Sequence, residues 1–356
     1  LLINIINIMT TLSRVEKWLN TNTFQLEQFR DLENLAKLKA EKGYSVAVVI
    51  PTLEEEETVG NVLDCLINKL IKENNIVDEM IIIDGGSKDK TKEICSLYSD
   101  NVTFYEQSKI LDKVCNFNGK GEALWKALYV TKSDIVIYID SDIKNFDERF
   151  VTGILGPILI NDSIKFVKGY YKRPYIASEG MKSNEGGRVT ELCARPLLNI
   201  LYPELSGFIQ PLGGEYGGFR SVLENIEYTS GYGVEVQSLI EILEKFGLDC
   251  IAQSNLIERV HRHQPINSLS KMSSAIMQTI LRRHIEGDKI NSSILIKNLM
   301  KENSSFVKSR SEDLLHCNCA GESITDDNFK YVEIKENILP CMSNIRSSLN
   351  SNLEMI

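Results

Sequence analysis

The stretch IVIYIDSDIKNF, residues 135–146, places an apolar, β-branched run directly before two acidic residues. Such a run predicts a buried β-strand. Asp140 and Asp142 are two residues apart, so on an extended backbone their carboxylates face the same side. Held about 4 Å apart at an effective dielectric near 20, they would repel each other by about 4 kcal/mol. We therefore expect a cation beside them.

Ligand chemistry narrows the identity of that cation. Carboxylate oxygens suit Mg²⁺ or Mn²⁺, and Mg²⁺ is usually held by one or two carboxylates together with substrate phosphates. Asp140 and Asp142 therefore indicate a nucleoside diphosphate site. A solvated strand end, whose carboxylates cap the next turn, explains this motif equally well on its own.

The segments upstream set this strand in an alternating pattern. From Ser45 onward, apolar runs at 46–51, 80–84 and 102–107 predict strands, and helical spacing predicts the helices that separate them, over about 56–73, 89–99 and 119–131. This alternation is typical of an α/β fold with a parallel sheet. Ligands of such sheets bind outside the carboxyl ends of the strands. We therefore expect the site where these strands end.

Composition limits the classes of partner. The chain has 356 residues and a formal net charge of −9. It is not expected to bind nucleic acid without sequence preference, because such binding relies on Lys and Arg that neutralise phosphates. Its eight cysteines show no paired framework, which favours reduced thiols in a cytoplasmic protein. We expect no membrane partner: the apolar start is too short to span a bilayer. Met9 is our candidate initiator, with residues 1–8 expected to be unstructured.

Two glycine-rich turns supply further candidate residues. Asp84 to Asp89 (DGGSKD) follows a predicted strand, where glycine lets the backbone approach a ligand and Ser or Asp can cap the next helix. Gly119-Lys120-Gly121 places an ammonium at a predicted helix start, although the spacing of a Walker loop is missing. A plain tight turn and a solvent-exposed lysine remain the simpler explanations of these two motifs taken alone.

The second half of the chain contains a candidate anion site. Gly187 and Arg188 lie in EGGRVTEL (185–192), a glycine turn that feeds a helix. Free backbone N–H groups, the helix dipole and the guanidinium would together bind a phosphate or carboxylate. Pairing of Arg188 with Glu185 or Glu191 is the equally plausible alternative.

Other polar residues in this half are open to two explanations each. His261 and His263 share one face of an extended segment and could complete a divalent site, although a structural role is commoner. Glu215 and Glu235 lie in glycine-rich surroundings and could orient sugar hydroxyls or act as a base, or they could pair with arginines. The spacing of His316-Cys317-Asn318-Cys319 is not that of a zinc site.

Taken in order, VVIPTLEEEETVGNVL, IIIDGGSKDKT, GKGEALWKAL and IYIDSD resemble the GT-A nucleotide-sugar transferases. In the second half, FVKGYYKRP, GGRVTELCARPLL, QPLGGEYGGFR, GYGVE and IAQSNLIERVHRHQP resemble the glucosyl-3-phosphoglycerate synthase family. The resemblance covers about residues 44–284. It implies a GT-A glycosyltransferase fold, with a Rossmann-like, mostly parallel central sheet flanked by helices.

The resemblance also implies an activity. Members of this family transfer glucose, with retention, from UDP- or GDP-glucose to the 2-hydroxyl of 3-phosphoglycerate, which leads to glucosylglycerate. The reaction depends on Mg²⁺, or on Mn²⁺ or Co²⁺, and the enzyme is expected to be a cytoplasmic homodimer. Residues 1–43 would then form an N-terminal helical segment, 44–142 the nucleotide-sugar half, 143–289 the acceptor half, and 290–356 a tail that is either partly disordered or an oligomerisation arm.

Site residues follow from the matching motifs. Metal would be held by Asp142 and His261, and the catalytic residues would be Glu235, Asp142 and Lys120. The nucleotide sugar would contact Pro51, Thr52, Leu53, Glu55, Ser87, Lys120, Asp140, Leu212, Tyr232 and Glu235. The acceptor would contact Gly187, Arg188, Val189, Thr190 and His263.

Three positions depart from the family pattern. Glu54 replaces a usual Asn, Thr52 a usual Ala, and His263 a usual Asn associated with the acceptor. Alternative functions are a mannosyl-3-phosphoglycerate synthase and a transferase acting on a polyprenyl phosphate. A third alternative, from another class, is a regulatory protein that binds a nucleotide sugar without turnover.

Overall fold

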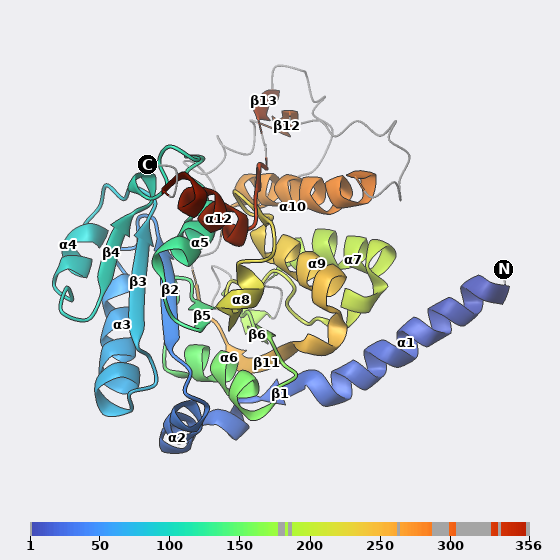
Figure 1. The fold of residues 1–356 in the computed structure, drawn as a ribbon. Coiled ribbons are helices and arrows are strands. Elements are labelled where there is room, and N and C mark those ends of the chain that lie inside the picture. The colour runs from blue at the N-terminus through green and yellow to red at the C-terminus, as the bar shows by residue number, and fades with distance from the viewer. Residues whose placement is uncertain are drawn as a thin grey trace.

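The computed structural model describes residues 2–176, 182–183, 187–261, 264–286, 299–303, 329–333 and 336–353. Within these ranges an eight-stranded sheet has the order β1-β11-β6-β9-β5-β2-β3-β4 (Figure 1). Its strands are β1 (Thr23–Gln25), β2 (Val46–Thr52), β3 (Glu79–Asp84), β4 (Thr103–Glu106), β5 (Ile135–Tyr138), β6 (Phe166–Lys172), β9 (Tyr216–Phe219) and β11 (Ile251–Glu258). Neighbours pair in parallel except that β9 is antiparallel to β5 and β6. The predicted mostly parallel α/β sheet is confirmed.

Both faces of the sheet are covered, which explains why its strands are apolar throughout. Along β2, Val49 faces one core, whereas Val48 and Ile50 face the other. The first core is closed by helices α5 (Lys120–Val130), α9 (Val234–Phe246), α10 (Ile266–Glu286) and α12 (Met342–Leu353). The second is closed by α2 (Leu32–Lys42), α3 (Val59–Cys65) and α6 (Arg149–Ile160).

The N-terminal segment is helical as predicted, but it is interrupted by β1. Helix α1 (Leu2–Asn22) ends where β1 joins β11, and Gly43 caps α2 with a φ of 67°. The buried Trp18 donates from Nε1 to the carbonyl of Ile251 at 2.7 Å. The expectation that residues 1–8 are unstructured is wrong for Leu2 onward, because isolated Asn residues lower helix propensity without ending a helix.

The helices between the strands lie where the spacing predicts them, with shifted ends. The predicted helix 56–73 is α3 continued by a π-helical segment, η2 (Leu66–Glu73), and the predicted helix 89–99 is the shorter α4 (Thr91–Ser96). The remaining elements are η1 (Leu26–Phe29), η3 (Gln107–Lys109), β7 (Tyr175–Ile176), β8 (Lys182–Ser183), η4 (Thr190–Ala194), α7 (Arg195–Leu201), η5 (Pro203–Gly207), α8 (Arg220–Leu223), β10 (Tyr228–Thr229), η6 (Leu248–Cys250), β12 (Leu299–Asn303), β13 (Phe329–Glu333) and β14 (Ile338–Leu339).

Part of the tail 290–356 folds onto the body of the protein. Strand β14 pairs antiparallel with β10, and α12 packs beside α5 (Figure 1). Leu339 and Met342 are buried. The His316–Cys319 motif lies outside the described residues. Each of the six cysteines in the described ranges is free. None of the helices in those ranges combines the length and apolarity that a bilayer crossing requires.

Candidate active site

A cavity of about 560 Å³ lies at the carboxyl ends of β2 and β5. It brings together residues that are more than two hundred positions apart in the sequence. The predicted site residues that line it are Pro51, Thr52, Leu53, Glu55, Lys120, Asp140, Asp142, Gly187, Arg188, Val189, Thr190, Leu212, Tyr232, Glu235 and His261. Ser87 is not among the residues that line the cavity, and His263 lies outside the described residues.

Lys120 is the first residue of α5 and forms two ion pairs. Its Nζ lies 2.6 Å from Oδ1 of Asp140 and 2.7 Å from Oε1 of Glu235, which is in the first turn of α9. Burial lowers the pKa of Lys120, but the two carboxylates outweigh it and hold the pKa above its ordinary value. Lys120 is therefore a fixed positive charge in the cavity wall, and the solvent-exposed lysine is ruled out.

The glycines beside Lys120 serve close packing. A Cβ at Gly119 would lie 2.2 Å from the carbonyl oxygen of Ser230, and a Cβ at Gly121 would lie 1.9 Å from that of Thr229. The amide of Glu122 donates to the Ser230 oxygen at 3.0 Å. The two glycines thus let the start of α5 dock against the segment that leads to Tyr232 and Glu235.

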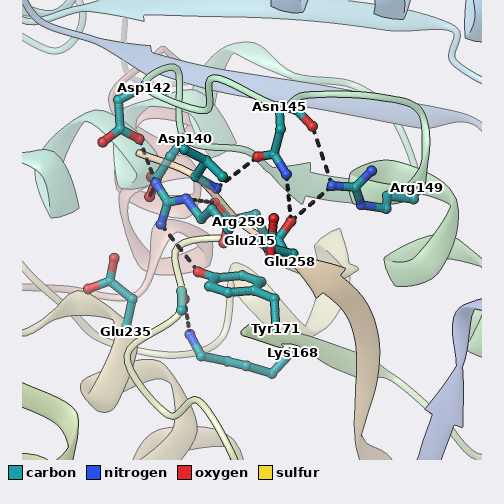
Figure 2. A network of polar contacts seen from close by, with 12 residues as sticks. Asp140, Asp142, Asn145, Arg149, Lys168, Tyr171, Glu215, Glu235, Glu258 and Arg259 are labelled. Atoms are coloured by element: carbon teal, nitrogen blue, oxygen red, sulfur yellow. Dashed lines mark hydrogen bonds and ion pairs between the residues drawn. The ribbon is translucent and has the colours of Figure 1, made fainter. Parts of the chain in front are cut away.

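Besides the divalent metal that the sequence predicts, the protein itself places a cation beside Asp140 and Asp142 (Figure 2). Nη2 of Arg259 lies 2.9 Å from Oδ2 of Asp140 and 2.5 Å from Oδ1 of Asp142. The same guanidinium donates from Nη1 to the Tyr171 hydroxyl at 3.2 Å, and its Nε lies 3.4 Å from Oε1 of Glu215. Burial raises the pKa of Asp140, but Lys120 and Arg259 more than offset this, so its pKa is lowered. Asp140 therefore stays ionised.

Arg259 is a residue that the sequence analysis did not single out. It follows β11 directly, and its side chain is only 3% exposed. A basic residue two positions before His261, at the end of an apolar strand, was the available signal. The alternative of a solvated strand end for Asp140 and Asp142 is excluded, since both carboxylates are engaged by a buried guanidinium.

The chemistry of the donor set fits a divalent metal. Asp142 and His261 both line the cavity, and carboxylate oxygen with imidazole nitrogen suits Mn²⁺ or Mg²⁺. The Asp142 side chain is 29% exposed, so it can reach a second cation besides Arg259. In the described part of the chain, no cluster of three or more His, Cys, Asp or Glu residues forms a complete metal site. Waters and phosphate oxygens of a substrate would complete the coordination.

A further buried polar contact near Asp140 is made by Lys168 (Figure 2). Lys168 is fully buried and donates to the Gly213 carbonyl at 2.6 Å. Burial lowers its pKa to about 7. A Cβ at Gly214 would lie 2.1 Å from Oδ2 of Asp140, so this loop packs directly on the carboxylate. Lys168 thereby fixes the loop that carries Leu212 into the cavity.

The residues after β2 form the side of the cavity next to β3. Thr52 donates from Oγ1 to Asp84 at 3.0 Å, and the Ser87 hydroxyl donates to the same carboxylate at 2.6 Å. The Ser87 oxygen also accepts from the amide of Glu54 at 2.9 Å. Glu54 has a φ of 59°, a conformation that favours Asn over Glu, which accounts for the usual family residue there. Ser87 thus supports this loop from behind.

The predicted anion site has the expected turn-and-helix geometry. Gly187 has a φ of 88°, in the left-handed region, and the helical segment begins with Arg188. Glu191 pairs with Arg195 at 2.8 Å and not with Arg188, whereas Glu185, the other proposed partner of Arg188, lies outside the described residues. Arg188 donates to the Gln264 carbonyl at 3.2 Å.

Buried polar atoms without a hydrogen-bond partner in the described structure gather beside this turn. They include Oγ1 of Thr190 and Nε of Arg173. Arg173 also lines the cavity, and its charge helps to lower the pKa of Asp140. A second guanidinium therefore lies between the anion turn and Asp140. Arg173 is another residue missed from the sequence, although it stands in the quoted motif FVKGYYKRP. Unsatisfied buried donors are costly unless a ligand fills them.

Comparisons with known proteins agree with this geometry. Residues 47–173 match the family model of glycosyl transferase family 2. The chain is 41% identical over 286 residues to glucosyl-3-phosphoglycerate synthase of Petrotoga mobilis, covering 79% of this chain and 87% of that protein. It is 42% identical to the synthase of Mycolicibacterium smegmatis over 268 residues, 75% of this chain and 86% of that one.

Solved structures resemble the whole fold. Mannosyl-3-phosphoglycerate synthase from Rubrobacter xylanophilus matches with a TM-score of 0.78 and 30% identity over 93% of this chain and 99% of that one. Glucosyl-3-phosphoglycerate synthase from Mycobacterium tuberculosis, solved with Mn²⁺, UDP and phosphoglyceric acid, matches with a TM-score of 0.70 and 32% identity over 88% and 95%. The predicted GT-A fold is confirmed, and the chain belongs to the glucosyl-3-phosphoglycerate synthase family of glycosyltransferases.

Proposed function

We propose that this protein transfers glucose, with retention, from UDP-glucose to the 2-hydroxyl of 3-phosphoglycerate. The observation that carries the proposal is a common cavity with two unlike sides. One side presents Lys120 beside Asp142 and His261. The other presents the Gly187–Thr190 turn, where Oγ1 of Thr190 and Nε of the nearby Arg173 have no hydrogen-bond partner among the described residues. The M. tuberculosis synthase has been solved with Mn²⁺, UDP-glucose and phosphoglyceric acid, which supports the same donor and acceptor here.

The donor would lie along the side formed by β2 and α5. Pro51, Thr52, Leu53 and Glu55 would contact the nucleoside, with Ser87 supporting them from behind, and Lys120 would meet the diphosphate. Asp142 and His261 would hold the metal, and Asp140 would support them. When bound, Mn²⁺ or Mg²⁺ supplies positive charge to the leaving diphosphate.

The residues of the chain account for the other parts of the reaction. The Lys120 ammonium, fixed by Asp140 and Glu235, stabilises the negative charge that develops on the leaving diphosphate. Glu235 faces the sugar together with Leu212 and Tyr232, and its carboxylate offsets the positive charge that develops at the anomeric carbon. In a front-face attack the acceptor hydroxyl gives its proton to the leaving phosphate oxygen, so Glu235 need not become a covalent nucleophile.

The acceptor would bind at the Gly187–Thr190 turn. Backbone N–H groups at Val189 and Thr190, the Thr190 hydroxyl and the Arg188 guanidinium would bind one of its two acidic groups. Arg173, with its unpartnered Nε, is placed to meet the other. His263 remains a proposed acceptor contact by family resemblance, and it makes acceptor affinity depend on pH.

The second candidate function is mannosyl transfer to the same acceptor. It is favoured by the structural match to mannosyl-3-phosphoglycerate synthase, which has a TM-score of 0.78. The two functions differ in the sugar that is transferred, which Leu212 and Tyr232 would contact.

One assay separates these possibilities. Purified protein would be incubated with 3-phosphoglycerate and UDP-glucose, GDP-glucose or GDP-mannose, with Mn²⁺, with Mg²⁺ and with a chelator. We expect metal-dependent turnover that is fastest with UDP-glucose, and loss of that turnover in Asp142→Ala. Faster turnover with GDP-mannose would favour the second candidate, mannosyl transfer. No turnover with any donor, in protein shown to be folded by circular dichroism, would overturn both.

The family resemblance also leads us to propose a cytoplasmic homodimer. Light scattering at micromolar concentration tests the dimer directly, and a monomeric mass there would contradict it.

A further inference from the structure

The C-terminal segment 336–353 is attached to a loop of the candidate active site (Figure 1). β14 pairs with β10 so that Leu339 lies opposite Tyr228. The pairing continues beyond the strands: the amide of Ser230 donates to the Asn337 carbonyl at 2.9 Å, and the amide of Asn337 donates to the Ser230 hydroxyl at 3.1 Å. The segment therefore meets the chain just before Tyr232 and Glu235.

Glu336 makes the closest contact with that loop. Its side chain is buried, and its Oε2 accepts a hydrogen bond from the Gly231 amide at 2.9 Å. Burial raises the pKa of Glu336, while hydrogen bonds from the amides of Gly231, Gly233 and Tyr232 act in the opposite direction. A buried carboxylate is costly unless it is hydrogen-bonded, and here the Gly231 amide of the loop provides a hydrogen bond.

The contact is too close for another residue at position 231. A Cβ on Gly231 would lie 2.6 Å from Oε1 of Glu336. The opposite side of the loop is held as tightly, because the carbonyls of Thr229 and Ser230 pack on Gly121 and Gly119. The loop is thus clamped between the start of α5, which carries Lys120, and Glu336.

The segment that carries Glu336 is itself anchored to the body of the protein. Nε1 of Trp125 donates to the Pro340 carbonyl at 2.7 Å, and Nη1 of Arg282 donates to the Glu336 carbonyl at 2.8 Å. Arg346 donates to the carbonyl of Leu128 at 2.6 Å, which ties α12 to the end of α5. The position of the Glu336 carboxylate is therefore fixed from several elements at once.

We propose that Glu336 is a positioning residue for sugar transfer. By accepting a hydrogen bond from the Gly231 amide, it fixes the entry to α9, so that Tyr232 faces the sugar and Glu235 stays within 2.7 Å of Lys120. Glu336 is not among the residues that line the cavity, and so it acts through the loop rather than on the substrate. The inference rests on the proposed function and makes the C-terminal segment part of the catalytic unit.

Enzyme kinetics test this role with a matched control. Glu336→Ala removes the carboxylate, Glu336→Gln keeps one acceptor oxygen, and Ser343→Ala removes a contact of α12 with Asn225 that is 3.0 Å long and remote from the loop. We expect Glu336→Ala to lower kcat by about 10- to 100-fold, since misplacement of about 1 Å can cost that much. The KM for the acceptor should change less than twofold, Glu336→Gln should recover part of kcat, and Ser343→Ala should match the wild type. A wild-type kcat in folded Glu336→Ala would overturn the role.

Hydrogen exchange separates this inference from the proposed function. In the full-length protein without substrates, Glu336→Ala should accelerate exchange of the amides of Gly231, Tyr232 and Gly233. Exchange at Val189 and Thr190, on the other side of the cavity, should remain unchanged. If these amides exchange equally fast in Glu336→Ala and in the wild type, Glu336 does not hold the loop, even if kcat falls. If the wild type turns over no donor, the proposed function fails. The exchange measurement still tests whether Glu336 holds the loop.

Discussion

The donor side and the acceptor side of the cavity are built in opposite ways. On the donor side, Lys120 and Arg259 are already paired with carboxylates at 2.5–2.9 Å. On the acceptor side, Thr190 and Arg173 keep buried polar atoms that have no partner among the described residues. The charged side chains of the donor side are therefore held in place by one another. On the acceptor side, we propose that the ligand supplies the missing hydrogen-bond partners. Substitutions on the first should affect turnover and folding together, and substitutions on the second should affect binding alone.

The largest expected effect is at Lys120. Lys120→Met removes the cation that we propose meets the donor diphosphate, and it leaves Asp140 and Glu235 without their ion-pair partner. By analogy with loss of a charge-stabilising donor, kcat should fall by about 10²- to 10³-fold. Steady-state kinetics with UDP-glucose, together with thermal unfolding, would measure both consequences. A normal kcat in Lys120→Met would contradict the view that the donor side is preorganised for turnover by its own charges.

The next effect is at Arg259, which neutralises Asp140 and Asp142. Arg259→Met leaves those carboxylates and Glu215 without their buried partner, so unfolding free energy should fall by about 3–5 kcal/mol. Added Mn²⁺ should raise Tm more in this variant than in the wild type, because the ion no longer competes with the guanidinium for Asp142. Differential scanning fluorimetry with and without Mn²⁺ checks this, and Arg259→Lys serves if the Met variant does not fold. Equal Mn²⁺ shifts in variant and wild type would argue against this competition.

A smaller and purely binding effect is expected on the acceptor side. Arg188→Ala removes one charge-assisted contact worth about 1.5–3 kcal/mol, so KM for 3-phosphoglycerate should rise by about 10- to 100-fold. Tm and kcat should change little. Arg195→Met on the same helical stretch is the control, because Arg195 pairs with Glu191 and does not line the cavity. If Arg188→Ala lowers kcat without changing KM, the acceptor side does not act through binding alone, and the difference from the donor side is contradicted.

The smallest effect is on the pH dependence of stability. Burial lowers the pKa of Lys168 to about 7, so between about pH 7 and 10.5 the unfolded chain binds more protons than the folded one. Wild-type stability should therefore rise relative to Lys168→Met as pH increases through this window, by at most about 1.4 kcal/mol per pH unit. Urea unfolding of both proteins at pH 7.5 and 9.0 measures the difference. Parallel stabilities would mean that Lys168 keeps an ordinary pKa.

The strands and the donor residues could be predicted because their signals are local. The apolar run of β5 predicts its burial, and the acidic pair after it predicts a nearby cation. The Gly187–Arg188 turn was likewise recognisable as a helix start that follows a glycine. These features depend on residues within a few positions of one another, and family resemblance then related them to a reaction.

The residues that the sequence did not reveal act over long distances in the chain. Arg259 pairs with Asp142 across 117 positions, and Glu336 binds Gly231 across 105. Arg259 has only its place at the end of an apolar strand as a local signal, and Glu336 has no motif that distinguishes it from a surface residue. Periodicity also could not show that part of the tail would add β14 to β10, since two residues are too few to form a pattern.

By itself, the sequence determined the alternation of strands and helices over residues 45–142 and the polar residues at those strand ends, because burial of apolar side chains sets their local spacing. Only the tertiary structure decided which charges neutralise one another: Arg259 with Asp140 and Asp142, Lys120 with Asp140 and Glu235. Electrostatic energy depends on distances of a few ångströms between groups that the fold alone brings together.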